Sequence, residues 1–243
     1  MKTKFIVSAI LLTGMLTACG KDAPVATATP VDEAPAAKAV AAEAAAPSRF
    51  DIYADVGLST DISHLSDQQK QMIGLLIDAG KITDDIFWQQ VWGDKDALLN
   101  SIEDPKARRF ALYNYGPWDR LAADQPFIES YGPRPPGARF YPEDMTKAEF
   151  EAWQQEGKDE QYSLVRRDEA GQLMLVPYSE AFEAQINEIA SLLTQAAELA
   201  EDEQFANYLT MRAEAMQTGE YQASDMAWMD MKSNTVDLVY GPI

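Results

Sequence analysis

The chain holds one imidazole and one thiol, on His64 and Cys19, and these are its first candidates for metal binding or acid–base chemistry. A zinc peptidase site of the His-x-x-His kind needs at least two imidazoles, so this sequence cannot supply one. No second ligand lies near His64 in the sequence, and a loop histidine that makes hydrogen bonds is favoured over a metal ligand or a base. The abundant carboxylates favour harder cations than zinc. We therefore predict no metal ligand, no cofactor and no catalytic residue in this chain.

Other side chains that could contact a ligand gather near the C-terminus. Asp237 lies inside the apolar run from Val236 to Tyr240, whose β-branched and aromatic residues predict a C-terminal strand. An acid buried there is costly unless it has a cationic or hydrogen-bonding partner. Two interpretations stay open: Asp237 recognises a ligand, or it lies on the solvent face of the strand. Asn234 ends the short helix predicted before this run, which Ser224 would cap.

The N-terminal residues predict that the chain is exported, and the folded elements come after them. Residues 1–18 have a short basic beginning and an apolar core from Phe5 to Leu16, too short to span a bilayer, which is typical of a signal peptide. The sequence LTAC that ends at Cys19 resembles the bacterial lipobox, so Cys19 is the predicted site of lipidation. An ordinary secretory signal is the alternative, disfavoured because unpaired thiols are rare in exported proteins. Gly20, in place of Asp, favours an outer-membrane anchor that faces the periplasm.

Residues 19–50 are predicted to form a disordered tether. From Gly20 to Ser48 the chain has no aromatic residue, Leu or Ile, so it cannot bury enough apolar surface to offset the entropy lost on ordering. Residues 51–243 are long enough for one domain with a sizeable core.

The charge balance excludes some partners. With 20 basic and 39 acidic side chains the chain carries a formal charge of −19. Such a surface repels nucleic acid and anionic lipid, so we predict no nucleic-acid partner and membrane association only through the lipid. Neutral or cationic partners fit this charge, although solubility alone would also explain it.

Hydrophobic spacing and capping residues predict a mainly α, α+β fold without a membrane span in the mature chain. A capping box at Ser66 and Gln69 begins a helix that ends at Gly80, and Thr83 begins the next. Further helices are predicted at 95–101, 106–113, 146–157, 179–200, 202–219 and 225–231. Residues 162–168 and 172–177 flank a turn with Gly171 and predict a β-hairpin. The segment 115–142 is rich in Gly and Pro but also in aromatic residues, so it is predicted as an ordered loop packed on the helices.

Three stretches carry a resemblance to a known family. NYGPWDRL (114–121), YPEDM (141–145) and WMDMKSNTVDLVYGPI (228–243) resemble segments of dipeptidyl peptidase III-like zinc peptidases. The resemblance spans about residues 58–243. It implies the N-terminal, substrate-binding portion of such a peptidase, lacking the HExxGH zinc motif; zinc is expected only in a full-length relative that has a C-terminal catalytic portion.

The resemblance also implies roles for three residues in peptide binding. Asp237 falls where the family has a Glu that meets the amino terminus of a peptide substrate, and Asn234 and Tyr240 lie beside it. This chain departs from the family in having Asp for Glu, one methylene shorter. The alternative function is non-enzymatic, a lipoprotein of the cell envelope that binds peptides or a partner protein.

Overall fold

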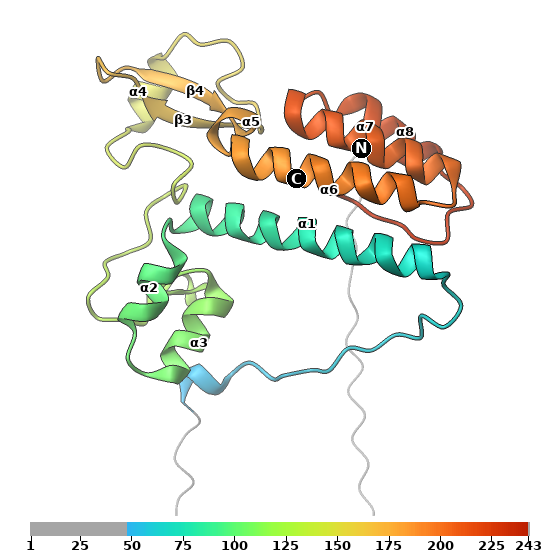
Figure 1. The fold of residues 1–243 in the computed structure, drawn as a ribbon. Coiled ribbons are helices and arrows are strands. Elements are labelled where there is room, and N and C mark those ends of the chain that lie inside the picture. The colour runs from blue at the N-terminus through green and yellow to red at the C-terminus, as the bar shows by residue number, and fades with distance from the viewer. Residues whose placement is uncertain (1–47, 243) are drawn as a thin grey trace, which may run out of the picture. The chain divides into compact units, whose positions relative to one another are not determined.

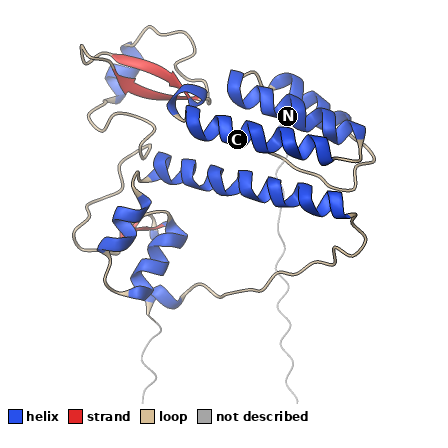
Figure 2. Cartoon of the chain, in the orientation of Figure 1, coloured by secondary structure: helices blue, strands red, loops and turns tan. Residues whose placement is uncertain are grey.

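The computed structural model describes residues 48–242, and all of them belong to one compact unit. The predicted signal peptide, Cys19 and almost all of the predicted tether lie outside the described residues. The helices are α1 (Asp67–Val91), α2 (Lys95–Ser101), α3 (Pro105–Asn114), α4 (Lys147–Ala152), α5 (Tyr178–Ala181), α6 (Glu183–Leu199), α7 (Glu203–Thr218) and α8 (Gln222–Asp230) (Figures 1 and 2). The strands form two antiparallel pairs, β1 (Trp118–Asp119) with β2 (Gln125–Pro126) and β3 (Ser163–Arg167) with β4 (Leu173–Pro177). This mainly helical α+β architecture confirms the predicted fold class.

Helix α1 is one uninterrupted helix where the sequence predicted two. Its capping box is the predicted one: the Ser66 side chain accepts from the Gln69 backbone N–H, and the Gln69 side chain accepts from the Ser66 N–H. The predicted end at Gly80 is wrong. The Thr83 hydroxyl caps no helix and donates instead to the Ala79 carbonyl, 3.3 Å away, inside the helix. Burial of apolar residues on both sides of Gly80 outweighs the roughly 1 kcal/mol that a helical glycine costs.

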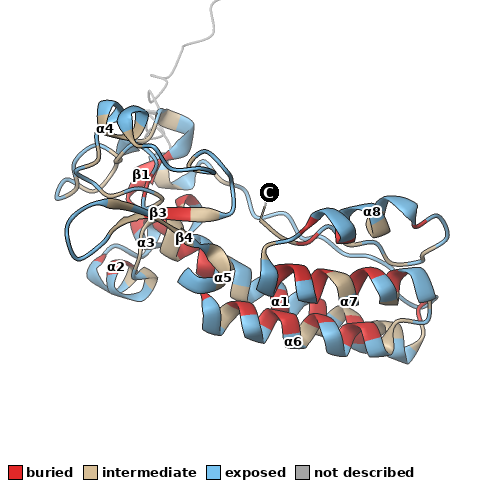
Figure 3. Cartoon of the chain, turned by 90° about the horizontal axis from the view of Figure 1, so that it is seen from above, coloured by how far each residue is buried: buried red, intermediate tan, exposed pale blue. Residues whose placement is uncertain are grey.

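Helices α1, α6 and α7 pack side by side and hold the main core (Figure 3). Asp202 accepts from two backbone N–H groups at the start of α7, and Gly219 ends α7 in the left-handed conformation, both as predicted. The predicted single helix from Ser179 is wrong. The chain breaks at Phe182, whose side chain is buried in the core, and so divides α5 from α6.

A second apolar cluster joins α1 to α2 and α3. Trp88, on α1, is 1% exposed and packs against Leu98, Ile102, Ala107 and Ala111. The loop of residues 115–142 covers this cluster with aromatic side chains, which confirms the predicted ordered loop.

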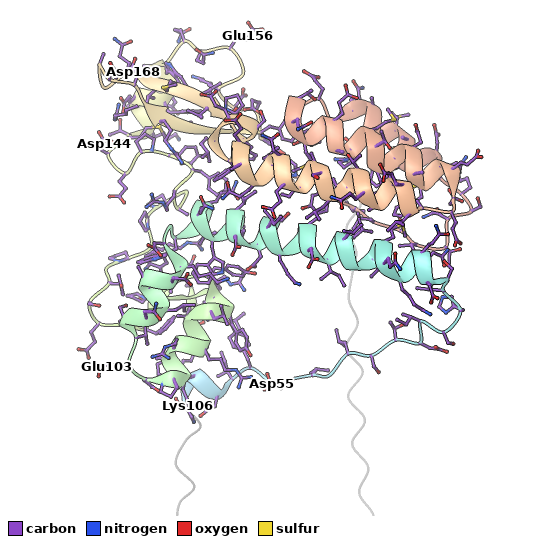
Figure 4. The ribbon with its side chains drawn as sticks, viewed as in Figure 1. Asp55, Glu103, Lys106, Asp144, Glu156 and Asp168 are labelled. Atoms are coloured by element: carbon purple, nitrogen blue, oxygen red, sulfur yellow. The ribbon has the colours of Figure 1, made fainter. Side chains whose placement is uncertain are left out.

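The predicted hairpin is present as β3 and β4. The Asp168 carboxylate accepts from the backbone N–H groups of Ala170 and Gln172 and so fixes the turn; Figure 4 shows Asp168 at this outer end of the hairpin. Arg166 and Arg167 lie close to the turn, and both are half-buried. Arg167 reaches across to the carboxylates of Asp144 and Glu149.

The predicted C-terminal strand is wrong. No strand of the described residues lies beside Val236–Tyr240, so the extended segment has no ladder to join. Its alternating apolar residues instead pack on the helical core, with Tyr240 buried and Val236 and Leu238 partly buried. Helix α8 also begins earlier than predicted, because Ser224 is buried inside it and its hydroxyl donates to the Tyr221 carbonyl. Within residues 48–242, no helix is both long and apolar enough to cross a membrane.

Candidate functional site

A cavity of about 700 Å³ lies between α1, the β3–β4 hairpin, the α5–α6 break and the last described residues. Its walls are mostly apolar and aromatic. Its lining includes Ile86 and Phe87 from α1, Phe140 from the loop, Val165 and Leu175 from the hairpin, Phe182 and Ile186 from the α5–α6 region, and Pro242. Because these residues come from segments far apart in the sequence, the cavity exists only in the folded domain.

Buried and half-buried tyrosines contribute to the cavity wall, among them Tyr178, Tyr221 and Tyr240. Burial raises the pKa of Tyr221 to about 12, against the opposing effect of the nearby Arg212 charge. Burial also raises the pKa of Tyr178, helped by the negative charge of Glu160, and burial raises that of Tyr240. The phenols of Tyr178 and Tyr221 therefore keep their protons at neutral pH and can donate hydrogen bonds to ligand carbonyl groups.

The charged residues of the cavity lie on the segment after α4. The Lys158 ammonium donates to the carbonyls of Phe150 and Trp153, each 2.8 Å away, so it completes the C-terminal end of α4. Asp159 and Glu160 also line the cavity and place two carboxylates there. The cavity thus combines apolar walls, neutral phenols and a negative edge.

Tyr240 is held from behind by α1. Its phenol donates to the Ala79 carbonyl at 2.9 Å, and its oxygen accepts from the Thr83 hydroxyl at 2.5 Å. The residue is 8% exposed, yet its ring contributes to the cavity wall beside Gly241 and Pro242. The structure therefore places Tyr240 at the cavity with its polar atom turned away from any ligand.

The structure places Asp237 and Asn234 elsewhere, at a smaller hollow of about 280 Å³ that they share with Trp228, Met229 and Met231. The Asp237 carboxylate is exposed and accepts a hydrogen bond from the Trp228 indole N–H at 2.9 Å. The Asn234 amide donates to the Val236 carbonyl, so it shapes the backbone of its own segment. Asn234 and Asp237 are thus brought together, whereas Tyr240 belongs to the larger cavity.

The stability of the domain is expected to fall as the pH rises from about 10 to about 12. The Tyr221 phenol has a raised pKa in the folded state, about 12 against an ordinary value of 10.0, so the unfolded chain ionises first. This contribution is fully present below the unfolded value and is lost as the pH rises through the folded one, with a slope of about 1.4 kcal/mol per pH unit. Urea unfolding across this range checks it. Tyr221→Phe should make the slope shallower, and an unchanged slope would contradict the assignment.

No family model matches the chain. Nudix hydrolase 3 of Arabidopsis thaliana is 27% identical over an alignment of 252 positions, which covers 78% of this chain and 32% of that protein. The structure of DPP III from Caldithrix abyssi matches 78% of this chain with a TM-score of 0.72 and 35% identity. The fold is dipeptidyl peptidase III-like. The structure of dipeptidyl-peptidase III from Corallococcus sp. strain EGB agrees, with 74% of this chain, a TM-score of 0.69 and 34% identity.

The likeness covers only part of each relative. The chain spans 38% and 36% of the two dipeptidyl peptidase III structures and 32% of the plant protein. The predicted resemblance is thus confirmed at the level of the dipeptidyl peptidase III-like fold.

Zinc does not fit the described part of this dipeptidyl peptidase III-like fold. Within residues 48–242, no group of three or more His, Cys, Asp or Glu side chains is placed to hold a metal ion. His64 lies in an exposed turn ahead of α1.

Sequence reasoning identified one of the cavity residues, Tyr240, and missed the others. The strongest available signal was the aromatic density of the Pro-rich loop, where Phe140 and Tyr141 are far too apolar for a solvated linker. The hairpin and the α5–α6 break gave no such signal, because their cavity residues have the spacing of ordinary core positions.

Proposed function

We propose that this chain provides the substrate-binding, non-zinc portion of a dipeptidyl peptidase III-like metallopeptidase, and that it holds a peptide in the cavity beside Tyr240. Cleavage would require a zinc-bearing portion that the described residues do not supply. The observation that carries the proposal is the match to two dipeptidyl peptidase III structures at 35% and 34% identity.

The chemistry of the cavity supports peptide binding. Sites for small organic ligands have volumes of about 300–1,000 Å³, apolar walls and a few placed polar groups, and this cavity of about 700 Å³ has all three. Neutral phenols suit backbone carbonyls, and the acids Asp159 and Glu160 suit a cationic group of a peptide. The net charge of −19 favours neutral or cationic peptides in the same way.

Leu175→Glu is expected to weaken the binding of short peptides about tenfold or more, because it puts a charge on the apolar cavity wall. Met174→Glu is the matched control: Met174 precedes Leu175 on β4, is 38% exposed and does not line the cavity. Fluorescence anisotropy with labelled tetrapeptides compares the two variants, and chromatography of the same samples follows cleavage. Equal affinities would place the ligand elsewhere. Zinc-dependent cleavage by the purified chain would show that it is a complete enzyme.

Asp237 is tested in the same assay. If Asp237 meets the free amino terminus of the peptide, Asp237→Asn should cost roughly 1.5–3 kcal/mol of binding for a free peptide and almost nothing for its N-acetylated form. Loss of affinity for both peptides alike, or for neither, would leave Asp237 only its hydrogen bond with Trp228.

We further propose that Cys19 is lipidated and that the lipid anchors the domain to the outer membrane, facing the periplasm. The LTAC sequence after a short apolar segment supports this. Replacing Cys19 by Ser is expected to move the protein from the membrane fraction to the soluble fraction, because no other attraction to anionic lipid is expected from so acidic a chain. Retention of the Cys19→Ser protein on membranes after a salt wash would exclude the lipid anchor.

A further inference from the structure

Two arginines near the cavity, Arg139 and Arg166, have no carboxylate partner among the described residues. Arg139 lies near the end of the Pro-rich loop, and its backbone N–H donates to the carbonyl of Gln90, near the end of α1. Arg166 lies on β3 and donates to the carbonyls of Phe140, at 3.3 Å, and Val165, at 2.8 Å. Gln90, Phe140 and Val165 all line the cavity, so both arginines are anchored to its wall.

Their surroundings hold the two cations without neutralising them. The Arg139 guanidinium packs against Gly93, which lies just beyond the C-terminal end of α1. A Cβ atom added to Gly93 would stand 3.3 Å from the Cζ atom of Arg139. The carbonyls at that end carry only partial negative charge, as do the two carbonyls that Arg166 contacts. Burial lowers the pKa of Arg166, and the positive charge of Arg139 lowers it further. The positive charges of Arg139 and Arg166 therefore repel each other, although the protein as a whole is acidic.

Neighbouring arginines on the same two segments behave differently. Arg134, on the same loop as Arg139, pairs with Asp124 at 3.1 Å. Arg167, next to Arg166 on β3, pairs with both Asp144 and Glu149. In a chain with 39 acidic side chains, carboxylates are easily supplied, yet among the described residues neither Arg139 nor Arg166 has one. An arginine pair that the fold holds but does not neutralise is suited to an external oxyanion, since the planar guanidinium donates in pairs to a carboxylate.

We propose that Arg139 and Arg166 form a carboxylate-binding site at the edge of the cavity, which receives an acidic group of the bound ligand. The inference rests on the proposed peptide-binding function and deepens it. The carboxylate comes either from the C-terminus of a peptide or from a Glu or Asp side chain within it, and both present the same chemistry to the two guanidinium groups. The acids Asp159 and Glu160 also line the cavity, so the domain offers a peptide both a negative and a positive region.

The test compares Arg139→Gln with Arg134→Gln, two loop arginines of which one is unpaired and the other is bound to Asp124. Each variant and the unaltered chain are titrated with a peptide as the free acid and as the C-terminal amide, and with an amidated peptide carrying internal Glu or Gln. Inorganic phosphate is titrated separately, followed by the Nε–H resonances of the arginines. Unfolding in urea is measured for all three proteins without ligand.

The expected result is that the unaltered chain and Arg134→Gln bind a carboxylate-bearing peptide about tenfold more tightly than its neutral counterpart, and that Arg139→Gln loses this preference. Phosphate should shift the Arg139 and Arg166 resonances, and Arg139→Gln should unfold at no lower urea concentration because a repulsion is removed. The acid–amide and Glu–Gln comparisons identify which carboxylate binds.

Two results would overturn the inference: phosphate shifts neither resonance, or Arg139→Gln keeps the full preference for the carboxylate. If peptides bind with no preference, the inference fails while the peptide-binding function stands. If no peptide binds but phosphate shifts both resonances, the anion site stands and the peptide-binding function fails.

Discussion

Replacing Leu209 by alanine is expected to lower the free energy of unfolding by about 3.5 kcal/mol, the middle of the range for buried leucines. Leu209 is 0% exposed on α7, inside the core shared by α1, α6 and α7. Cavity formation adds to the lost transfer free energy, since well-packed helices relax only partly around a missing side chain. Urea unfolding at constant m value measures the change.

Leu112→Ala is the matched control for Leu209→Ala. The same leucine-to-alanine substitution is made on α3, but the Leu112 side chain is 39% exposed. Its cost should stay below about 1 kcal/mol. If the two substitutions cost the same, the three-helix core is not the main source of stability in this domain.

The helices could be predicted from the sequence wherever a local signal decides. Asp94, Asp104, Asp202 and Ser66 accept from backbone N–H groups at the starts of their helices, and each is visible as a capping residue in the sequence. The β-hairpin was equally local, because its turn depends on Gly171 and on the two hydrogen bonds to Asp168.

The errors arose where tertiary contacts override local preference. Gly80 and Thr83 predict a helix end and a helix start, yet α1 continues without a break through both, because its apolar residues pack on both sides of the helix. The break between α5 and α6 lies at Phe182, whose ring is buried. No capping residue marks this break in the sequence. Val236–Tyr240 has strand composition, but a strand also needs a neighbour, and the sequence does not say which segment lies beside it.

The candidate site was less predictable than the fold for the same reason. Tyr240 and Asp237 are three residues apart in the sequence, but one lines the large cavity and the other lines a separate hollow. Arg139 and Arg166 are 27 positions apart and become neighbours only when the loop reaches the hairpin. Sequence spacing identifies sites within one element, whereas both of these sites combine several.

A buried guanidinium on α7 leads to the second large effect. Arg212 is 6% exposed and lies between the rings of Tyr208 and Tyr221, with its central carbon 5.4 Å from each ring centre. Its one carboxylate partner among the described residues is Asp225 on α8, and its Nε–H has no acceptor. The same guanidinium packs against Gly241, which lines the cavity. A Cβ atom added to Gly241 would stand only 2.9 Å from Nη1 of Arg212, so Arg212 also restricts the backbone at this part of the cavity wall.

Asp225→Asn is therefore expected to lower the free energy of unfolding by about 2–3 kcal/mol, because it leaves a buried positive charge without a full counter-charge. The value is below the range for fully buried pairs, since the Asp225 side chain is 55% exposed and partly screened by water. Asp230→Asn is the control: it makes the same change on α8 at an exposed residue that forms no ion pair in the described structure, and should stay within about 0.5 kcal/mol. Arg212→Lys should not restore stability in the Asp225 variant, because an ammonium cannot fill the planar space between two rings. Equal costs for Asp225→Asn and Asp230→Asn in urea unfolding would mean that the tyrosine faces alone stabilise the Arg212 charge.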